Sequence, residues 1–530
     1  MKKYHIKGNS ALQSLNKKNE TNSIFLSLLV LVTAAPGLIL IGVIMDRIGH
    51  ANASDLTHYL SEHVEFHGFI RQRVSLNMED PIETKRDDQL DLSMMRSTFY
   101  LEGNARFDWV SFTAIARFDW EYMTKYLRRL EHMTTRHLKG EYDDYDLREF
   151  YADFNLFDER LFLRIGKQQV VWGKTDFFRG LDIIHGFDYR WRSFLEPENE
   201  LLRKPLTLVN AEVQLPELKG VLQLIIRPGL DRKKDIGNTY DAFGGRWANQ
   251  PNKGINSLES MRYNLEHSEG DRDDLTYGMR WSGRAWSVEY SLNYLHTFNN
   301  DPLVNPSQAI GGDPFHEDPR NDFAEFIYPQ VDIAGFTVNY YLASLDMIVR
   351  CEFSYTWEQP YNYGQQFQDG TLPGFAGIIE KDTIRSMLAF DKNVDWVKPL
   401  FGACRPGFLN IQIFDTWLME FERHEDIVAA AGYGAHLRRH STILTAILSW
   451  NYNFDTINPT MAWGTDLRNG GGFVIPSVQF VRGDHWRLRI EYDWFYDNKG
   501  KKPGKIEHQA RTFNFFDNND QLYLRLTYQF

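Results

Sequence analysis

The sequence is poor in cysteine, in net positive charge and in long apolar runs, and each shortage excludes a class of protein. Two cysteines, Cys351 and Cys404, are too few for a disulfide framework. The 59 basic and 71 acidic residues leave the chain acidic, which argues against nucleic acid as a partner. The mean hydropathy of -0.45 is far too polar for a bundle of membrane helices.

One long apolar run is present, near the amino terminus. Lysines between Lys2 and Lys18 precede an apolar stretch at 24–45, and Ala51-Asn52-Ala53 has the small-x-small pattern that signal peptidase needs. We therefore predict a Sec-type signal peptide over residues 1–53 and a mature chain that begins at Ser54. The alternative is a retained anchor, because the run is long enough to span a bilayer. No later segment is apolar enough to be a membrane helix.

Aromatic residues are abundant, at 15% of the chain, and many short segments alternate between apolar and polar positions. In 110–121, and again in 486–496, a large apolar or small side chain occupies every second position and polar ones fill most positions between. Successive strand side chains point to opposite faces, so such segments offer one face to lipid and one to a wet lumen. A soluble sandwich can show this pattern once, but its repetition predicts an all-β fold, a transmembrane antiparallel β-barrel.

The alternation predicts about 18 strands, or 16 to 20 if one hairpin is misplaced. Short connections, such as 157–159, 282–283 and 482–485, fall at one end, and long ones, such as 231–273 and 298–330, fall at the other. This is the asymmetry of periplasmic turns and extracellular loops. A short amphipathic helix is expected over 123–139, in an outer loop. The predicted strands are 64–75, 92–102, 110–121, 147–156, 160–171, 206–215, 221–227, 275–281, 286–294, 331–342, 347–357, 383–391, 408–421, 428–438, 442–453, 473–481, 486–496 and 521–530.

The last strand, Gln521 to Phe530, has apolar residues at every second position and resembles the closing strand of bacterial outer-membrane proteins. We predict that Tyr528 and Phe530 form a signal for the barrel assembly machinery. The expected location is therefore the outer membrane of a Gram-negative bacterium, with outer-membrane lipid around residues 54–530 as a single barrel domain.

Barrels of 16 to 18 strands enclose a lumen that admits water and solutes, so passage is the expected function. The inward charges carry both signs. They either pair with one another and stiffen the wall, or form an arginine-lined constriction that selects anionic or polar solutes. The predicted lumen residues are Arg71, Arg73, Arg96, Arg117, Asp119, Glu149, Asp153, Arg164, Arg280, Arg350, Glu352, Arg487, Arg489, Glu491, Asp493 and Arg525.

A competing class is an outer-membrane hydrolase. The sequence has no Gly-x-Ser-x-Gly elbow and no His-Glu-x-x-His pair, and we predict no catalytic residues. The acidic run Asp517 to Asp520 lacks the spacing of a calcium loop, so no metal site and no cofactor are predicted. A third class is a plugged barrel that serves as a scaffold for partner proteins.

The stretch Gly166-Lys167-Gln168-Gln169-Val170-Val171-Trp172-Gly173 breaks the alternation, because Lys167 would face lipid in a regular strand. Either a bulge at Gly166 or emergence above the bilayer would resolve this. The pattern Gly-x-Gln-x-Val-x-Trp-Gly, followed by Arg179-x-x-Asp182 and a strand at 206–213, resembles the outer-membrane family catalogued as domain of unknown function 1302. His185-Gly186 stands where that family usually has Asn-Pro. The resemblance implies an outer-membrane barrel, often encoded near exporter-type inner-membrane permeases and hydrophobic-compound metabolism. It therefore implies that the protein belongs to an export system and that such a permease is its partner.

The segment at about 172–205 carries more aromatic mass than a solvated loop needs. We expect it to fold into the lumen as a constriction that sets selectivity, with Trp172, Asp176, Arg179 and Asp182 as its key residues. The alternative is an outward loop that packs on its neighbours as a lid.

Overall fold

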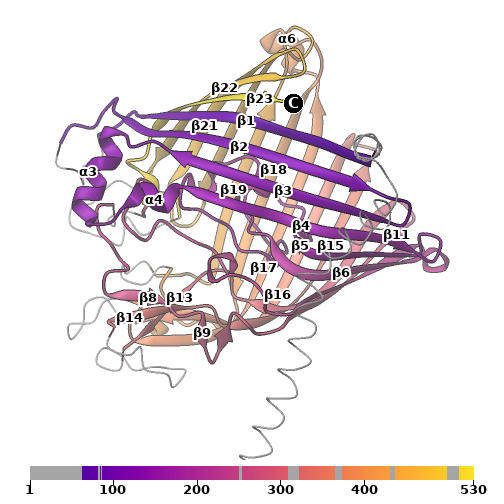
Figure 1. Cartoon of the computed structure of the whole chain (residues 1–530), viewed down its shortest axis with the longest axis horizontal. Coiled ribbons are helices and arrows are strands. Elements are labelled where there is room, and N and C mark those ends of the chain that lie inside the picture. The colour runs from indigo at the N-terminus through magenta and orange to yellow at the C-terminus, as the bar shows by residue number, and fades with distance from the viewer. Residues whose placement is uncertain are drawn as a thin grey trace, which may run out of the picture.

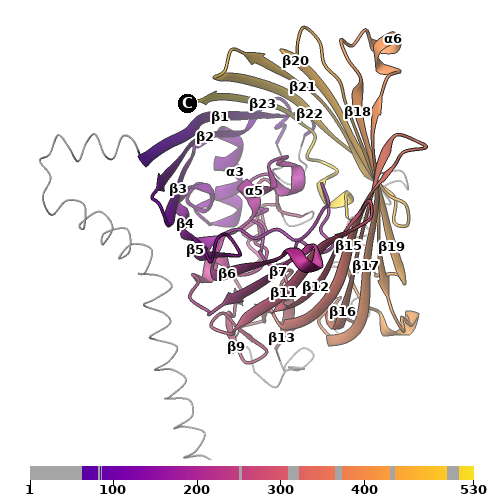
Figure 2. The same cartoon turned by 90° about the vertical axis from the view of Figure 1, so that its right-hand side faces the viewer.

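Eighteen antiparallel strands form one sheet that closes on itself (Figures 1 and 2). The computed structural model describes residues 63–80, 84, 86–249, 253–307, 322–364, 373–429, 436–497 and 512–530. The first strand, β1 (Val64–Asn77), and the last, β23 (Gln521–Gln529), close the barrel. They pair continuously from Phe69 opposite Gln529 to Asn77 opposite Gln521. The predicted barrel and its strand number are confirmed. The predicted signal peptide lies outside the described residues.

The strands run around the barrel in chain order. Their bounds are β1 Val64–Asn77, β2 Leu92–Arg106, β3 Val110–Glu121, β4 Asp144–Leu156, β5 Leu161–Gln168, β6 Leu206–Leu215, β7 Gly220–Arg227, β11 Thr276–Ala285, β12 Val288–Phe298, β15 Gln330–Leu342, β16 Met347–Tyr363, β17 Gly377–Val394, β18 Gly407–Leu418, β19 His440–Ser449, β20 Ile457–Asp466, β21 Gly472–Arg482, β22 Trp486–Tyr496 and β23 Gln521–Gln529.

Two predicted strand positions are wrong, and the errors cancel in the count. The segment 428–438 is not a strand where it is described: Val428 and His436 form only an isolated bridge. The chain instead places β20 between β19 and β21, where Pro459 and Gly464 interrupt the apolar pattern. Pro459 has no amide N–H to donate to the ladder, but its carbonyl still accepts from the Trp450 amide, at 3.1 Å.

Two smaller corrections concern connections. β11 continues to Ala285, so the predicted turn at 282–283 is a pair of ladder positions and the turn is at Trp286-Ser287. The single helix predicted over 123–139 is two helices, α3 (Lys125–Thr134) and α4 (Leu138–Tyr142). They separate at Thr135, whose φ of 55° ends α3 in the left-handed region.

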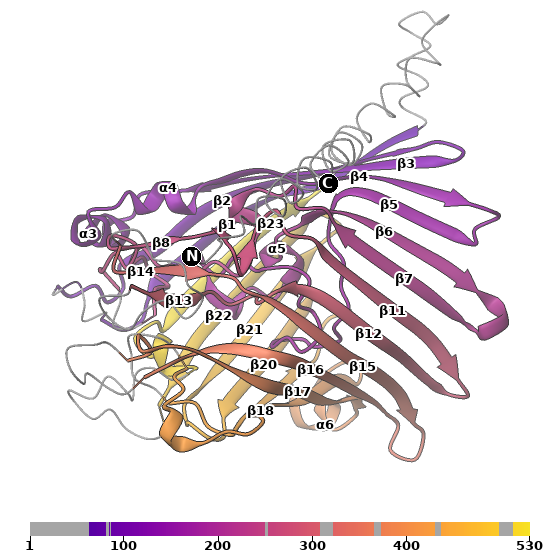
Figure 3. The same cartoon turned by 90° about the horizontal axis from the view of Figure 1, so that it is seen from below.

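Long and short connections lie at opposite ends of the barrel. The end with α3 and α4 also carries two small sheets, one of β8 (Met261–Tyr263), β13 (Leu303–Pro306) and β14 (Ala324–Ile327), the other of β9 (Glu266–His267) and β10 (Gly270–Asp271) (Figures 1 and 3). The other end has tight turns, with α6 (Val397–Phe401) in its longest one. Several tight turns expose a large apolar tip, such as Phe157, Trp286 and Phe454.

The outer face of the barrel is apolar and the inner face is polar. Phe118, Trp120, Trp494 and Leu526 point outward and are exposed, whereas the residues between them point inward and are buried. An exposed apolar belt of this kind suits lipid, because in water it would be a very large unpartnered patch. Among the described residues, no helix combines the length and apolarity that a membrane crossing requires.

The barrel interior is not empty. The chain between β5 and β6, residues 169–205, enters it, and α5 (Asn199–Leu202) lies within the ring of strands in Figure 2. Phe194 of this segment packs against Phe473 of β21 and against Phe513 and Phe516, with ring centroids 5.6 to 6.0 Å apart. We call residues 169–205 the inner segment.

Candidate functional site in the barrel interior

The inner segment is tied to β1 and β23 by a group of ion pairs. Arg71 contacts Glu198 at 2.6 Å and Arg73 contacts Glu196 at 3.6 Å. Arg525 reaches both glutamates, at 3.2 and 3.0 Å. Burying charges is costly unless each one is paired, so these five side chains hold one another in place. Three predicted lumen arginines are thus bonded to the inner segment.

A second group lies on β2 and β3. Asp119 sits between Arg96, at 3.0 Å, and Arg117, at 2.9 Å. Arg117 also donates to the Leu201 carbonyl of α5 at 2.7 Å. Glu121, one ladder step away, pairs with Arg246 of the long β7–β11 connection at 2.9 Å. Polar groups of β2 and β3, of the inner segment and of the β7–β11 connection therefore meet on this wall, and the charged side chains among them are buried.

On β22, the neighbour of β23, Glu491 and Asp493 both contact Arg192 of the inner segment. Its guanidinium lies 3.8 Å from the centre of the Tyr523 ring and donates to the Leu195 carbonyl at 2.7 Å. Arg192 is 1% exposed. Sequence reasoning did not single out Arg192, because alternation assigns faces only to strand residues.

β16 binds residues 174–181 of the inner segment. Glu352 accepts from the backbone amides of Lys174, at 2.8 Å, and Leu181, at 2.5 Å. Its neighbour Arg350 pairs with Asp176 at 2.8 Å and with Asp391 of β17 at 2.7 Å. The inner segment thus reaches from β1 across the barrel to β16.

The other predicted residues of β4, β5 and β22 have more local partners. Asp153 and Arg164 pair with each other at 2.6 Å across neighbouring strands. Glu149 accepts from the Gln169 side chain at 2.8 Å, where the inner segment begins. Arg489 pairs with Glu491 at 2.6 Å. Arg487 donates only to backbone carbonyls at the short-turn end, those of Gly483 and Trp486.

The break in alternation after Gly166 has a simple geometry. The β4–β5 ladder continues through Gly166 without a bulge, but Gly166 has a φ of 132°, which favours glycine. A Cβ there would lie 2.2 Å from the Phe150 carbonyl oxygen. Lys167 is not left in lipid, because its ammonium reaches Asp146 and Asp235 at 3.5 and 3.6 Å.

His185 joins the two ends of the inner segment. Its Nε2 accepts from the Val170 amide at 2.9 Å, so Nδ1 carries the proton and donates to the Lys204 carbonyl at 3.0 Å. Burial, with Arg203 nearby, lowers the pKa of His185 to about 3. The imidazole is therefore neutral and fixed in one tautomer.

The residues predicted to form the constriction are each bonded within or around the inner segment. The Trp172 indole donates to Gln223 of β7 at 2.9 Å. Asp182 pairs with Arg203 at 2.5 Å. Arg179 donates to the His185 carbonyl at 2.9 Å and lies over the Phe187 ring. Asp176 is the most exposed of the four and points toward Arg350.

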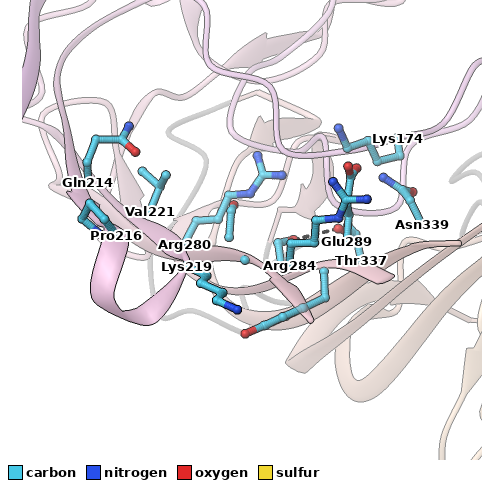
Figure 4. Close-up of a pocket in the computed structure, with 15 residues that line it drawn as sticks. Lys174, Gln214, Pro216, Lys219, Val221, Arg280, Arg284, Glu289, Thr337 and Asn339 are labelled. Atoms are coloured by element: carbon cyan, nitrogen blue, oxygen red, sulfur yellow. Dashed lines mark hydrogen bonds between the residues drawn. The ribbon is translucent and has the colours of Figure 1, made fainter. Parts of the chain in front are cut away.

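A cavity of about 510 Å³ lies beside the inner segment, toward the short turns (Figure 4). Strands β6, β7, β11, β12 and β15 and the side chain of Lys174 line it. Its cations are Lys174, Lys219, Arg280 and Arg284, and Glu289 is the one carboxylate in its lining. Sequence reasoning found only Arg280. Arg284 shares its parity and could have been found, whereas Lys174 and Lys219 lie in connections.

The carboxyl end packs against the start of the barrel. The Phe530 amide and carbonyl both bond to Gly68, at 3.0 Å each. The Phe530 ring stacks on Phe99, with centroids 6.4 Å apart, and the Tyr528 ring lies 4.9 Å from that of Trp486. A Cβ on Gly68 would come within 2.8 Å of the Phe530 ring. A role of Tyr528 and Phe530 in assembly stays a prediction.

In the described part of the chain, no three His, Cys, Asp or Glu side chains are grouped so that they could hold a metal ion.

No curated protein matches the sequence. Solved structures with a similar outline include OccAB3 of Acinetobacter baumannii, with a TM-score of 0.45, 9% identity and 88% and 99% of the two chains covered. OpdK of Pseudomonas aeruginosa with vanillate is similar with a TM-score of 0.42 and 11% identity, and the match covers 88% of this chain and 99% of that chain. These low scores carry no inference about function.

The sequence family described as Protein of unknown function (DUF1302) matches residues 82–530, which include every strand except β1. The match extends well beyond the stretch from Leu147 to Leu215 that mainly carries the resemblance noted above. The chain therefore belongs to this family.

Proposed function

We propose that the protein is an outer-membrane channel for small solutes, narrowed by its inner segment. The observation that supports this most is the uneven filling of the closed barrel. The wall formed by β1–β4, β22 and β23 is packed against the inner segment, whereas the wall formed by β6, β7, β11, β12 and β15 borders a cavity of about 510 Å³. A lumen that is partly filled restricts passage without closing it.

The apolar outer belt supports a location in the outer membrane, with lipid as the surrounding partner. Sec-type export, recognition by the barrel assembly machinery and an exporter-type inner-membrane permease are further parts of the proposal. Sequencing the amino terminus of the purified protein tests the first part, because cleavage after Ala53 leaves Ser54 as the first residue. Crosslinking in intact cells tests the two protein partners.

Single-channel recording of the purified, folded protein in a planar bilayer tests passage directly. We expect discrete conductance steps, and a larger step after the inner segment is shortened between Gly173 and Lys204. Folding is checked on the same samples, because a closed barrel migrates differently on a denaturing gel before and after boiling. A folded protein that never conducts, in either form, would contradict the channel.

A plugged barrel that acts as a scaffold is the second candidate. It is supported by the nearly complete burial of Arg73, Arg96, Asp119 and Asp493, which face the interior on the wall packed against the inner segment. The two candidates differ in the shortened variant. A scaffold conducts only after shortening, whereas a channel conducts in both forms. Catalysis is not part of either candidate.

A further inference from the structure

The cations of the interior fall into two classes. Arg71, Arg96 and Arg350 each have a carboxylate within 4 Å, and so have most other arginines of the packed wall. The exceptions on that wall, Arg148 and Arg487, donate to backbone carbonyls instead. For Lys174, Lys219, Arg280 and Arg284, no carboxylate among the described residues comes within that distance. These four side chains line the same cavity, although they come from three separate connections or strands.

Arg280 is the centre of this second class. Its guanidinium donates to one protein atom, the Val171 carbonyl, at 3.3 Å. Its Nε atom is buried and has no hydrogen-bond partner among the described residues. A guanidinium has five donors, and leaving most of them unused in a partly enclosed space is unfavourable unless water or a ligand accepts them.

The charge of the cavity is positive even when nearby carboxylates are counted. Glu289 faces Arg284 directly in the β11–β12 ladder, so these two can neutralise each other. Glu212, on β6, accepts from Gln223, and Glu352, on β16, accepts from the backbone amides of Lys174 and Leu181. Both carboxylates act on Arg280. Three negative charges against four positive ones leave an excess of one. The hydroxyls and amides of Ser282, Gln214 and Asn339 surround the cations, as Figure 4 shows in part.

We propose that this cavity binds a small organic dianion, such as a dicarboxylate, on its way through the channel. The volume of about 510 Å³ is within the usual range for small-molecule sites. Arginine offers paired donors to a carboxylate, and the two lysines add charge without fixing its orientation. The inference rests on the proposed channel, because the cavity must be reached through the lumen.

The test uses succinate as the probe and succinamide as its neutral analogue, with the full-length folded protein in a planar bilayer. We expect succinate, but not succinamide, to reduce the chloride-salt current in a saturable way. Arg280→Gln should raise the half-blocking concentration about fourfold, the effect of one charge at about 5 Å in a largely aqueous site. Lys219→Gln, in an exposed turn, should act in the same direction and is the less disruptive variant.

Arg487→Gln is the matched control, because it removes the same charge from the inner face of β22, outside the cavity. Its half-blocking concentration should stay within about twofold of the wild type, since charges beyond a Debye length are screened. Equal effects of Arg280→Gln and Arg487→Gln, or equal block by succinate and succinamide, would overturn the dianion site while leaving the channel in place.

Calorimetric titration of succinate into the detergent-purified protein separates the two proposals. Binding that Arg280→Gln weakens, in a protein that does not conduct, would support the site and refute passage. A conducting protein without succinate binding would refute the site alone.

Discussion

Replacing Arg192 by Met should loosen the inner segment from β22. In the wild type, Arg192 contacts Glu491 and Asp493, donates to the Leu195 carbonyl and lies over Tyr523. Removing one partner of a buried ion pair typically costs about 3 to 5 kcal/mol, because the remaining charge stays buried without its partner.

The lower end of that range applies here, because Glu491 keeps a second partner in Arg489, at 2.6 Å. A loss of about 3 kcal/mol raises the population of locally open states by roughly 100-fold. Amide hydrogen exchange around residues 190–196 should speed up by about that factor, and the single-channel current should become larger or noisier.

Two further variants show whether the charge or the packing matters. Arg192→Met combined with Asp493→Asn leaves no buried charge unpaired, because Glu491 keeps Arg489 at 2.6 Å, and such a replacement is often neutral in stability. Slow exchange should therefore return in the double variant. Arg487→Met serves as the control, because Arg487 bonds only to backbone carbonyls. Unchanged exchange and unchanged current in a correctly folded Arg192→Met protein would refute the idea that ion pairs hold the inner segment.

Four other outcomes are expected. Glu352→Gln should speed hydrogen exchange at the Lys174 and Leu181 amides by about tenfold or more, since each loses a charge-assisted bond, and exchange near Arg192 should not change. The pKa of His185 is lowered from 6.5 to about 3, so below pH 6.5 the unfolded chain binds a proton that the folded chain excludes. The compact form on unheated gels should therefore lose stability as the pH falls from 6.5 toward 3, with a shallower decline in His185→Gln. Deletion of Phe530 should lower the yield of inserted barrel, and normal insertion would exclude an assembly role. Raising the salt concentration from about 0.1 to 1 M shortens the Debye length from about 10 to 3 Å, so any anion preference should fall while the folded state persists.

The strands could be predicted because lipid on one face and a polar interior on the other impose a period of two. β22 and β23 show it cleanly, and both were located to within a residue. β20 was missed because Pro459 and Gly464 replace strand-forming residues, although Ile457, Met461 and Trp463 share one parity. The predicted strand at 428–438 is wrong because Val428 to Gly432 is a continuous run of small apolar residues, which does not by itself require strand pairing.

The filling of the lumen could not be predicted in the same way. Alternation shows that Glu491 points inward, but its partner Arg192 is 299 residues earlier in a segment without regular structure. Which inward charges meet depends on the path of that segment through the barrel. The aromatic composition of 172–205 indicates that its side chains must be buried against other residues. Phe194, for example, packs against Phe473 and Phe513.

The two interpretations of the inward charges apply to different walls of the same barrel. On β1–β4, β22 and β23, arginines and carboxylates pair with one another or with the inner segment, so they stiffen the structure and are unavailable to a solute. On β7 and β11, the inner segment approaches with the Val171 carbonyl and with Lys174 rather than with a carboxylate. A positive charge that the protein does not neutralise must be balanced by ions or solutes from the lumen. In the proposed channel the inner segment separates the two roles, because its Glu196 and Glu198 face one wall and its Lys174 faces the other.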